Sequence, residues 1–171
     1  MLEIAETSEK DTLMDLRCGD GRILFTAALD FKVRQAIGYE IDPELCRQVN
    51  EQAFNQGLNE RVKAINLDLF EADLSGASIV TLYLTTAGNE RLKPKLQKET
   101  SHGTRIVSHD FVITDWTAER VLATDTEALN PHHIYVYRTP QSFQKKDACR
   151  IRTILPRVLR RLSRPRHRPH E

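Results

Sequence analysis

A glycine-rich segment near the start of the chain and a carboxylate further on are the residues best suited to chemistry. Gly19 and Gly21 lie between an apolar stretch, residues 13–16, and residues 22–28, whose apolar side chains recur at helical spacing. Glycine lets a ligand approach the backbone closely, and a helix N-terminus offers free N–H donors. Glu40 follows Gly21 by 19 residues, and its carboxylate can accept hydrogen bonds from both hydroxyls of a ribose. The spacing therefore predicts a site for a nucleoside-containing cofactor.

Two classes of cofactor compete for this pattern. A dinucleotide site uses G-x-G-x-x-G, whose third glycine lets the helix pack closely beneath a pyrophosphate. Leu24 stands in that place, and Asp15 and Asp20 would crowd a pyrophosphate with negative charge. The methionine end of S-adenosylmethionine instead carries an ammonium and a sulfonium. The residues favour S-adenosylmethionine over a dinucleotide. A glycine turn that binds no ligand is the third interpretation.

Alternating strands and helices are needed to position these residues. Strands are predicted over 13–16, 35–39, 61–66, 79–84, 104–108 and 133–138, and helices over 22–28, 43–56 and 89–98. Strands separated by helices imply right-handed crossovers and an open sheet that binds ligands at the carboxyl ends of its strands. Residues 17–21, Glu40, Asp68 and residues 84–88 all fall at that edge.

Composition is consistent with one domain. A chain of 171 residues with 40% hydrophobic residues has enough apolar surface for a single core. Its cysteines, Cys18, Cys46 and Cys149, lie far apart, so neither a disulfide framework nor a metal site is predicted. No signal peptide or apolar run of membrane-spanning length is apparent. We expect a cytoplasmic monomer without a transmembrane segment.

Charge divides the chain into two parts. Residues 1–144 hold 15 Lys and Arg against 22 Asp and Glu, whereas residues 145–171 hold 10 against 2. We therefore predict a domain over 1–140 and a basic tail over 141–171. Apolar residues between 151 and 162 recur at helical spacing, which predicts a basic amphipathic helix from Leu155 that contacts an anionic surface, RNA or an acidic partner through residues 145–171. A disordered solubilising tail is the other interpretation.

Three segments carry a resemblance to a known family. DLRCGDGRI with GYEIDPEL, IVTLYLTTAGNERLKPKL and GTRIVSHDFVITDW resemble the small seven-strand protein-lysine methyltransferases of archaea and bacteria. These are relatives of the histone lysine methyltransferases that lack a SET domain and of the enzyme that methylates the ATP synthase c-subunit. The resemblance implies an α/β, Rossmann-like seven-strand methyltransferase sandwich with a mostly parallel sheet. It also implies methyl transfer from S-adenosylmethionine to lysine side chains of protein substrates.

The resemblance assigns cofactor contacts to the strand ends. Asp15, Arg17, Gly19 and Gly21 would surround the methionine moiety, and Glu40 would bind the ribose. The adenine and the transferable methyl would be contacted by Asp68, Leu69, Leu84, Thr85 and Thr86. Asp68 also fits a solvated loop position, and the two threonines also fit caps of the following helix.

The acceptor amine needs a different environment. A lysine of pKa ~10.4 is mostly protonated at neutral pH, so an apolar channel that lowers its pKa favours the reactive form. Tyr83, Phe111 and Trp116 are the candidates for that channel, although aromatic residues near strands are often part of a core. His109 and Asp110 are candidates to accept the proton through water, and His109 also fits a hydrogen-bonded structural histidine.

Two departures from the family pattern raise a second hypothesis. Arg17 replaces the family's first glycine, where a positive φ would cost a non-glycine residue roughly 1–2 kcal/mol. Its guanidinium would repel a sulfonium unless it turns outward or binds the ligand carboxylate. Met1 also falls inside what resembles the family's leading helix, so we expect the upstream cover of the cofactor to be missing. The alternative is a degenerate methyltransferase fold with weak or no catalysis that acts as a binding module.

Overall fold

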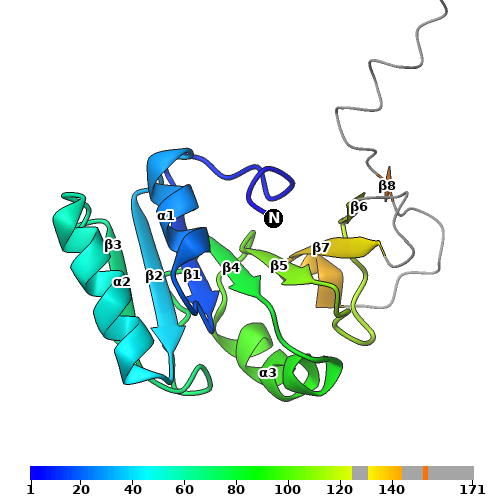
Figure 1. Cartoon of the computed structure of the whole chain (residues 1–171). Coiled ribbons are helices and arrows are strands. Elements are labelled where there is room, and N and C mark those ends of the chain that lie inside the picture. The colour runs from blue at the N-terminus through cyan, green and yellow to red at the C-terminus, as the bar shows by residue number, and fades with distance from the viewer. Residues whose placement is uncertain (125–130, 144–151, 154–171) are drawn as a thin grey trace, which may run out of the picture.

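The computed structural model describes residues 1–124, 131–143 and 152–153, which form one sheet flanked by helices (Figure 1). Its elements are β1 (Thr12–Leu16), α1 (Arg22–Leu29), β2 (Gln35–Glu40), α2 (Pro43–Asn55), β3 (Val62–Asn66), β4 (Ile79–Leu82), α3 (Thr86–Glu99), β5 (Arg105–His109), β6 (Arg120–Thr124), β7 (His132–Arg138), the 3₁₀ turn η1 (Gln141–Phe143) and β8 (Arg152–Thr153). The strand order is β3-β2-β1-β4-β5-β7-β6-β8.

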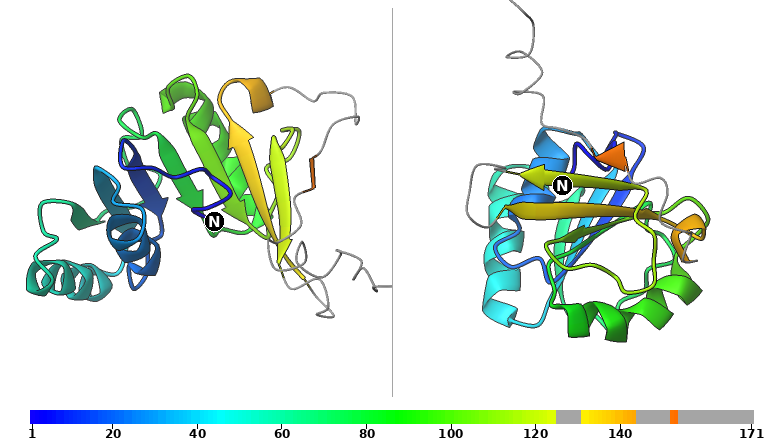
Figure 2. Two further views of the ribbon diagram at one scale, coloured as in Figure 1. Left: turned by 90° about the horizontal axis from the view of Figure 1, so that it is seen from above. Right: turned by 90° about the vertical axis from the view of Figure 1, so that its right-hand side faces the viewer.

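The order of the strands brings the carboxyl ends of β1, β2, β4 and β5 to one edge. Met14 of β1 pairs with Ile37 of β2 on one side and Val80 of β4 on the other, and all these pairings are parallel. β7 runs antiparallel to both β5 and β6 and lies beside them at the end of the sheet away from α2 (Figure 2). β2 and β3 are added on one side of β1 and β4 and β5 on its other side, so the strand order reverses between β1 and β4, the kind of switch point at which open α/β sheets bind ligands.

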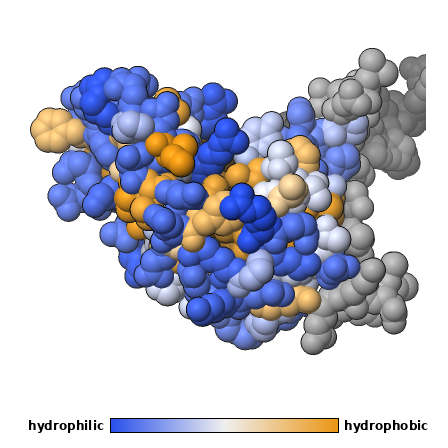
Figure 3. Space-filling view, turned by 90° about the horizontal axis from the view of Figure 1, so that it is seen from below, coloured by the Kyte–Doolittle hydropathy of each residue, from blue (hydrophilic) through white to orange (hydrophobic). Residues whose placement is uncertain are grey.

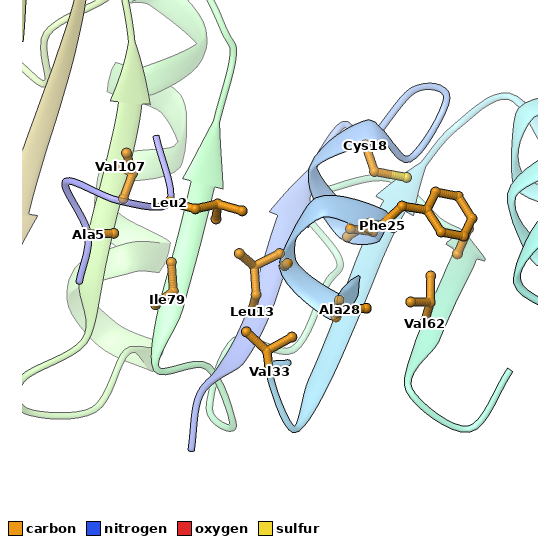
Figure 4. Packing of buried hydrophobic residues seen from close by; sticks show 14 of the residues in the cluster. Leu2, Ala5, Leu13, Cys18, Phe25, Ala28, Val33, Val62, Ile79 and Val107 are labelled. Atoms are coloured by element: carbon orange, nitrogen blue, oxygen red, sulfur yellow. The ribbon is translucent and has the colours of Figure 1, made fainter. Parts of the chain in front are cut away.

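Two apolar clusters cover the two faces of the sheet. Leu24 of α1 and Val49 of α2 belong to one cluster, and Leu92 and Leu96 of α3 belong to the other. Every residue of β1 and β4 is buried, as expected of strands covered on both faces. Figure 4 shows α1 over β1 and β2, and the N-terminal residues Leu2 and Ala5 beside Ile79 and Val107.

The predicted α/β fold with a mostly parallel sheet is confirmed, with differences at element ends. β4 ends at Leu82, not at residue 84, because Thr85 caps α3, which begins at Thr86. The sequence analysis missed β6, whose residues are all only partly buried and show no alternation of apolar and polar faces. None of the described helices is long and apolar enough to cross a bilayer.

Residues beyond Pro140 also contact the sheet. The backbone N–H of Arg138 donates to Ser142 Oγ at 2.9 Å, and the ring of Phe143 lies 4.5 Å from that of Trp116. β8 pairs with β6 through Arg152. The domain boundary at residue 140 remains a prediction, and the amphipathic helix predicted from Leu155 lies outside the described residues.

Candidate active site

The turn between β1 and α1 has the backbone conformation that its glycines suggested. Arg17, Gly19 and Gly21 have φ values of 83°, 56° and 76°, and the Gly21 N–H closes the turn on the Cys18 carbonyl at 3.0 Å. A Cβ on Gly21 would come within 2.9 Å of Val49, so this glycine is needed for packing. A Cβ on Gly19 would meet nothing within 4 Å, so the backbone there is open to a ligand.

Glu40 is fixed at the end of β2 by backbone donors. Its Oε2 accepts from the Gly19 N–H at 3.0 Å, and its Oε1 accepts from the N–H groups of Ile41 (2.9 Å) and Asp42 (3.2 Å). The side chain is buried, and Asn66 Nδ2 donates to the Glu40 carbonyl at 3.0 Å. These bonds set the orientation of a carboxylate that retains acceptor capacity for ribose hydroxyls.

Asp15 is a buried acid beneath the same turn. Thr81 Oγ1 donates to its carboxylate at 2.8 Å. Burial raises the pKa of Asp15 to about 7, the hydrogen bond from Thr81 opposes that rise, and the charge of Glu40 adds to it. Nearby positive charge favours the ionised form of such a group, so a bound ammonium would stabilise the Asp15 carboxylate. Asp20, in contrast, is exposed and forms an ion pair with Arg22 at 2.8 Å.

The residues predicted to contact adenine lie in the connection after β3. Asp68 is exposed, and its Oδ1 accepts from the Phe70 N–H at 3.0 Å, while Leu69 is half-buried. Asn66, which the sequence analysis did not select, ties this connection to β2 by donating to the Ile41 carbonyl at 2.8 Å. Its position as a polar residue at the end of a parallel strand was the feature of the sequence that could have identified Asn66 as a candidate.

The segment after β4 is organised by a helix cap. Leu84 is buried, and Thr85 Oγ1 accepts from the Gly88 N–H at 3.2 Å, which explains Thr85 as the N-cap of α3. Thr86 is exposed in the first turn. Asn89, also not selected, is fully buried, and its Nδ2 donates to the Phe111 carbonyl at 3.0 Å. Asn89 therefore joins α3 to the connection that follows β5.

The three predicted channel aromatics occupy different environments. Tyr83 is 58% exposed, Phe111 is half-buried, and Trp116 is 8% exposed. The Trp116 ring contacts those of Tyr137 and Phe143, at 5.8 and 4.5 Å between centroids, so core packing accounts for its position. Tyr83, which follows β4, instead meets His109 of the neighbouring strand β5 edge to face, with 4.7 Å between ring centroids. The structure therefore brings together Tyr83 and His109, and it places Trp116 in the core.

Apolar side chains gather at the carboxyl edge of the sheet. Figure 3 views the face toward which β1, β2 and β4 point, and an apolar area occupies its middle. Exposed apolar residues that follow strands or belong to nearby connections include Ile41, Tyr83 and Val112. A separate hollow is lined by α2 residues, among them Arg47 and Phe54, and contains none of the predicted site residues.

Comparison with known proteins assigns this arrangement to a family. The family model described as the ANTKMT methyltransferase domain matches residues 15–120. The chain belongs to this family. It is 44% identical over 137 residues to a protein-lysine N-methyltransferase of Saccharolobus islandicus, which is 80% of this chain and 84% of that protein. A mouse adenine nucleotide translocase lysine N-methyltransferase is 30% identical over 72% of this chain, and the chain spans 53% of that relative.

A solved structure extends the likeness to the cofactor. A crystal structure titled as an RNA methyltransferase from Salinibacter ruber with S-adenosyl-L-homocysteine is 36% identical, with a TM-score of 0.74 over 88% of this chain and 92% of that one. The chain is a methyltransferase that uses S-adenosylmethionine. Open backbone at Gly19, the fixed Glu40 carboxylate and the buried Asp15 acid fit the ribose and the ammonium of that cofactor.

Arg17 of this methyltransferase has a positive φ although it is not a glycine. Its N–H donates to the Tyr39 carbonyl at 2.9 Å, and its φ of 83° is the strained conformation that the sequence analysis considered. The side chain is exposed. The replacement therefore leaves the turn intact, and the guanidinium extends into solvent.

Proposed function

We propose that this methyltransferase transfers a methyl group from S-adenosylmethionine to the side-chain amine of lysine in protein substrates. The observation that carries the proposal is the 44% identity to a protein-lysine N-methyltransferase over 84% of that relative. LTTAGN, residues 84–89, supports it as well, because nucleic-acid amino-methyltransferases carry an Asn/Asp-Pro-Pro-aromatic signature at this place.

Each residue of the site has a separate role in the proposed reaction. S-adenosylmethionine supplies an electrophilic methyl on a sulfonium. In this proposal Glu40 binds the ribose, Asp15 pairs with the methionine ammonium, and Leu84 closes the site beside the methyl. Holding amine and methyl in line contributes up to roughly 7–11 kcal/mol to the lowering of the barrier. The amine must also lose a proton, which costs about 4.6 kcal/mol for an unperturbed lysine at pH 7.

RNA methylation is the second candidate. The Salinibacter ruber structure titled as an RNA methyltransferase favours it, since it covers 88% of this chain. The basic residues 145–171 also suit a polyanion. We propose that these residues strengthen contact with an anionic surface or acidic partner.

The free, buried thiols of Cys18 and Cys46 support our expectation of a cytoplasmic location.

One assay separates the candidates. The full chain is incubated with methyl-labelled S-adenosylmethionine and, in parallel, with protein extract, the same extract treated to acetylate lysines, and total RNA. Lysine methylation predicts label in the untreated protein and its loss after acetylation. Label in RNA alone would support the second candidate. Calorimetry showing cofactor binding without transfer to either would support the degenerate binding module.

A further inference from the structure

Side chains from three neighbouring strands converge beyond the predicted methyl position. Tyr83 follows β4, His109 and Asp110 lie at the end of β5, and His132 begins β7. His132 reaches this edge because β7 is antiparallel, with Ile134 paired to His109. The ring centroids of His109 and His132 are 5.1 Å apart, and those of Tyr83 and His109 are 4.7 Å apart. The cofactor turn follows β1, so this cluster lies toward the acceptor side of the sheet.

Asp110 is held so that one carboxylate oxygen faces His132. Its N–H donates to the His133 carbonyl at 2.7 Å, and its Oδ1 accepts from the His133 N–H at 2.8 Å. The remaining oxygen, Oδ2, lies 2.6 Å from His132 Nδ1 and 3.1 Å from His109 Nδ1. Asp110 has a φ of 61°, a conformation that costs a non-glycine residue free energy and often marks functional positions.

This contact has the geometry of a hydrogen bond rather than of metal ligation. Donor atoms of His109, Asp110 and His132 all lie within 4.8 Å of one another. Two ligands of a tetrahedral ion with bonds of about 2.0 Å are about 3.3 Å apart. The separation of 2.6 Å between Asp110 Oδ2 and His132 Nδ1 is shorter than that and is typical of a charge-assisted hydrogen bond.

The Asp110 carboxylate also decides which nitrogen of His132 is free. An ionised carboxylate accepts from Nδ1–H and so favours the tautomer in which Nε2 carries a lone pair. Burial alone would raise the pKa of Asp110, but the N–H of His133 and the ring of His132 together hold it below its usual value. His132 is 59% exposed, so its ring is within reach of a substrate side chain.

We propose that His132 is the general base that takes the proton from the substrate ammonium, and that Asp110 is its positioning residue. The inference rests on the proposed lysine methylation. One N–H bond of the ammonium breaks and the proton moves to His132 Nε2. The freed lone pair then bonds to the methyl carbon, the carbon–sulfur bond breaks, and its electron pair stays on sulfur. His132 afterwards releases the proton to water.

The groups around His132 are compatible with a positive charge on its ring. Burial is the main cause that lowers the pKa of His109; the charge of Asp110 opposes this effect, and the charge of His132 adds to it. Titratable groups near the pair include Tyr83 after β4, His109 on β5, Tyr135 on β7 and, at longer range, the N-terminal ammonium of Met1. The Asp110 carboxylate is the counter-ion of the protonated imidazole.

The test measures single-turnover methylation of a lysine substrate against pH with the full chain. His132→Gln should lower the rate at pH 7 by about 100-fold, the order that general-base catalysis supplies, and should change the dependence of the rate on pH. Its rate should then rise with pH as solvent deprotonates the amine. Asp110→Asn, which tolerates a positive φ, should give a smaller loss. His133→Gln, whose ring stacks on Tyr135, is the matched control and should behave as wild type.

Cofactor affinity, measured by calorimetry, should stay unchanged in all three variants. A His132→Gln enzyme with the wild-type rate and pH profile, or one no slower than His133→Gln, would overturn the inference while leaving lysine methylation standing. A wild type that binds the cofactor but methylates no lysine would overturn the proposed function and this inference together.

Discussion

Replacing Asp15 by Asn should stabilise the cofactor-free protein and weaken cofactor binding. Asn has the same shape, and its carbonyl oxygen can still accept from Thr81 Oγ1. Asp15 has its pKa raised from 3.8 to about 7, with burial as the first cause. Between these pH values the folded protein holds a proton that the unfolded chain releases. Stability contributed by this group is therefore present at low pH and lost as pH rises to about 7.

The size of the effect follows from the shift. Each pKa unit corresponds to 1.36 kcal/mol, so the ionised Asp15 costs up to about 4 kcal/mol of folding free energy above pH 7. Asp15→Asn removes that cost, and its gain over wild type should be roughly 2–3 kcal/mol larger at pH 8 than at pH 5. Urea unfolding of the cofactor-free protein at the two pH values measures the difference.

A control in the same turn and a binding assay complete the experiment. Asp20→Asn alters an exposed ion pair and should change stability by less than about 1 kcal/mol at either pH. Because the bound ammonium needs the Asp15 charge, Asp15→Asn should weaken S-adenosylmethionine binding at least tenfold in calorimetry, about 1.4 kcal/mol. An Asn variant that is less stable than wild type at pH 8, or that binds the cofactor equally well, would show that Asp15 is neither a buried acid of raised pKa nor a partner of the ammonium.

Three further predictions concern the cofactor turn and the tail. Glu40→Ala should weaken S-adenosylmethionine binding at least tenfold, since a charge-assisted hydrogen bond contributes about 1.5–3 kcal/mol; unchanged calorimetric affinity with an intact circular dichroism spectrum would remove Glu40 from the site. Arg17→Gly should raise that affinity, because it removes a side chain and a like charge from the turn, and relief of roughly 1–2 kcal/mol of strain at φ 83° should raise stability; abolished binding would instead show that Arg17 holds the ligand. Deletion after Phe143, which keeps the contact with Trp116, should leave cofactor affinity nearly unchanged and abolish any binding to anionic vesicles or RNA; a fall of many degrees in melting temperature would show that the deleted residues belong to the core.

The cofactor turn was predictable because its signals are local. The spacing of Gly19, Gly21 and Glu40 matches a strand, a turn, a helix and a second strand, and this arrangement places the turn beside the end of the second strand. In the structure the Gly19 N–H donates to the Glu40 carboxylate. Asp42 followed by Pro43 is likewise typical of a helix N-terminus, and the structure has α2 begin there. The Asp42 side chain accepts from the Glu44 N–H at 2.9 Å.

The acceptor side was less predictable because it depends on long-range pairing. His132 meets Asp110 because β7 pairs antiparallel with β5, after the chain has passed through β6, the strand that the sequence analysis missed. In the sequence, Trp116 and Tyr83 were equally good candidates for the apolar channel. Trp116 is buried and Tyr83 is exposed, and no local sequence pattern predicts this difference. Asn89 gave no signal of its own, since its partners at Phe111 and Val112 follow a different strand.

Lysine methylation itself is tested most directly by mapping the transferred methyl. Protein extract is incubated with the full chain and methyl-labelled S-adenosylmethionine, and labelled peptides are sequenced by mass spectrometry beside a reaction with His132→Gln. We expect label on lysine side chains in the wild-type reaction, with strongly reduced label for the variant. A chain that binds S-adenosylmethionine but leaves every lysine unlabelled, or that labels only RNA in a parallel reaction, would contradict lysine methylation.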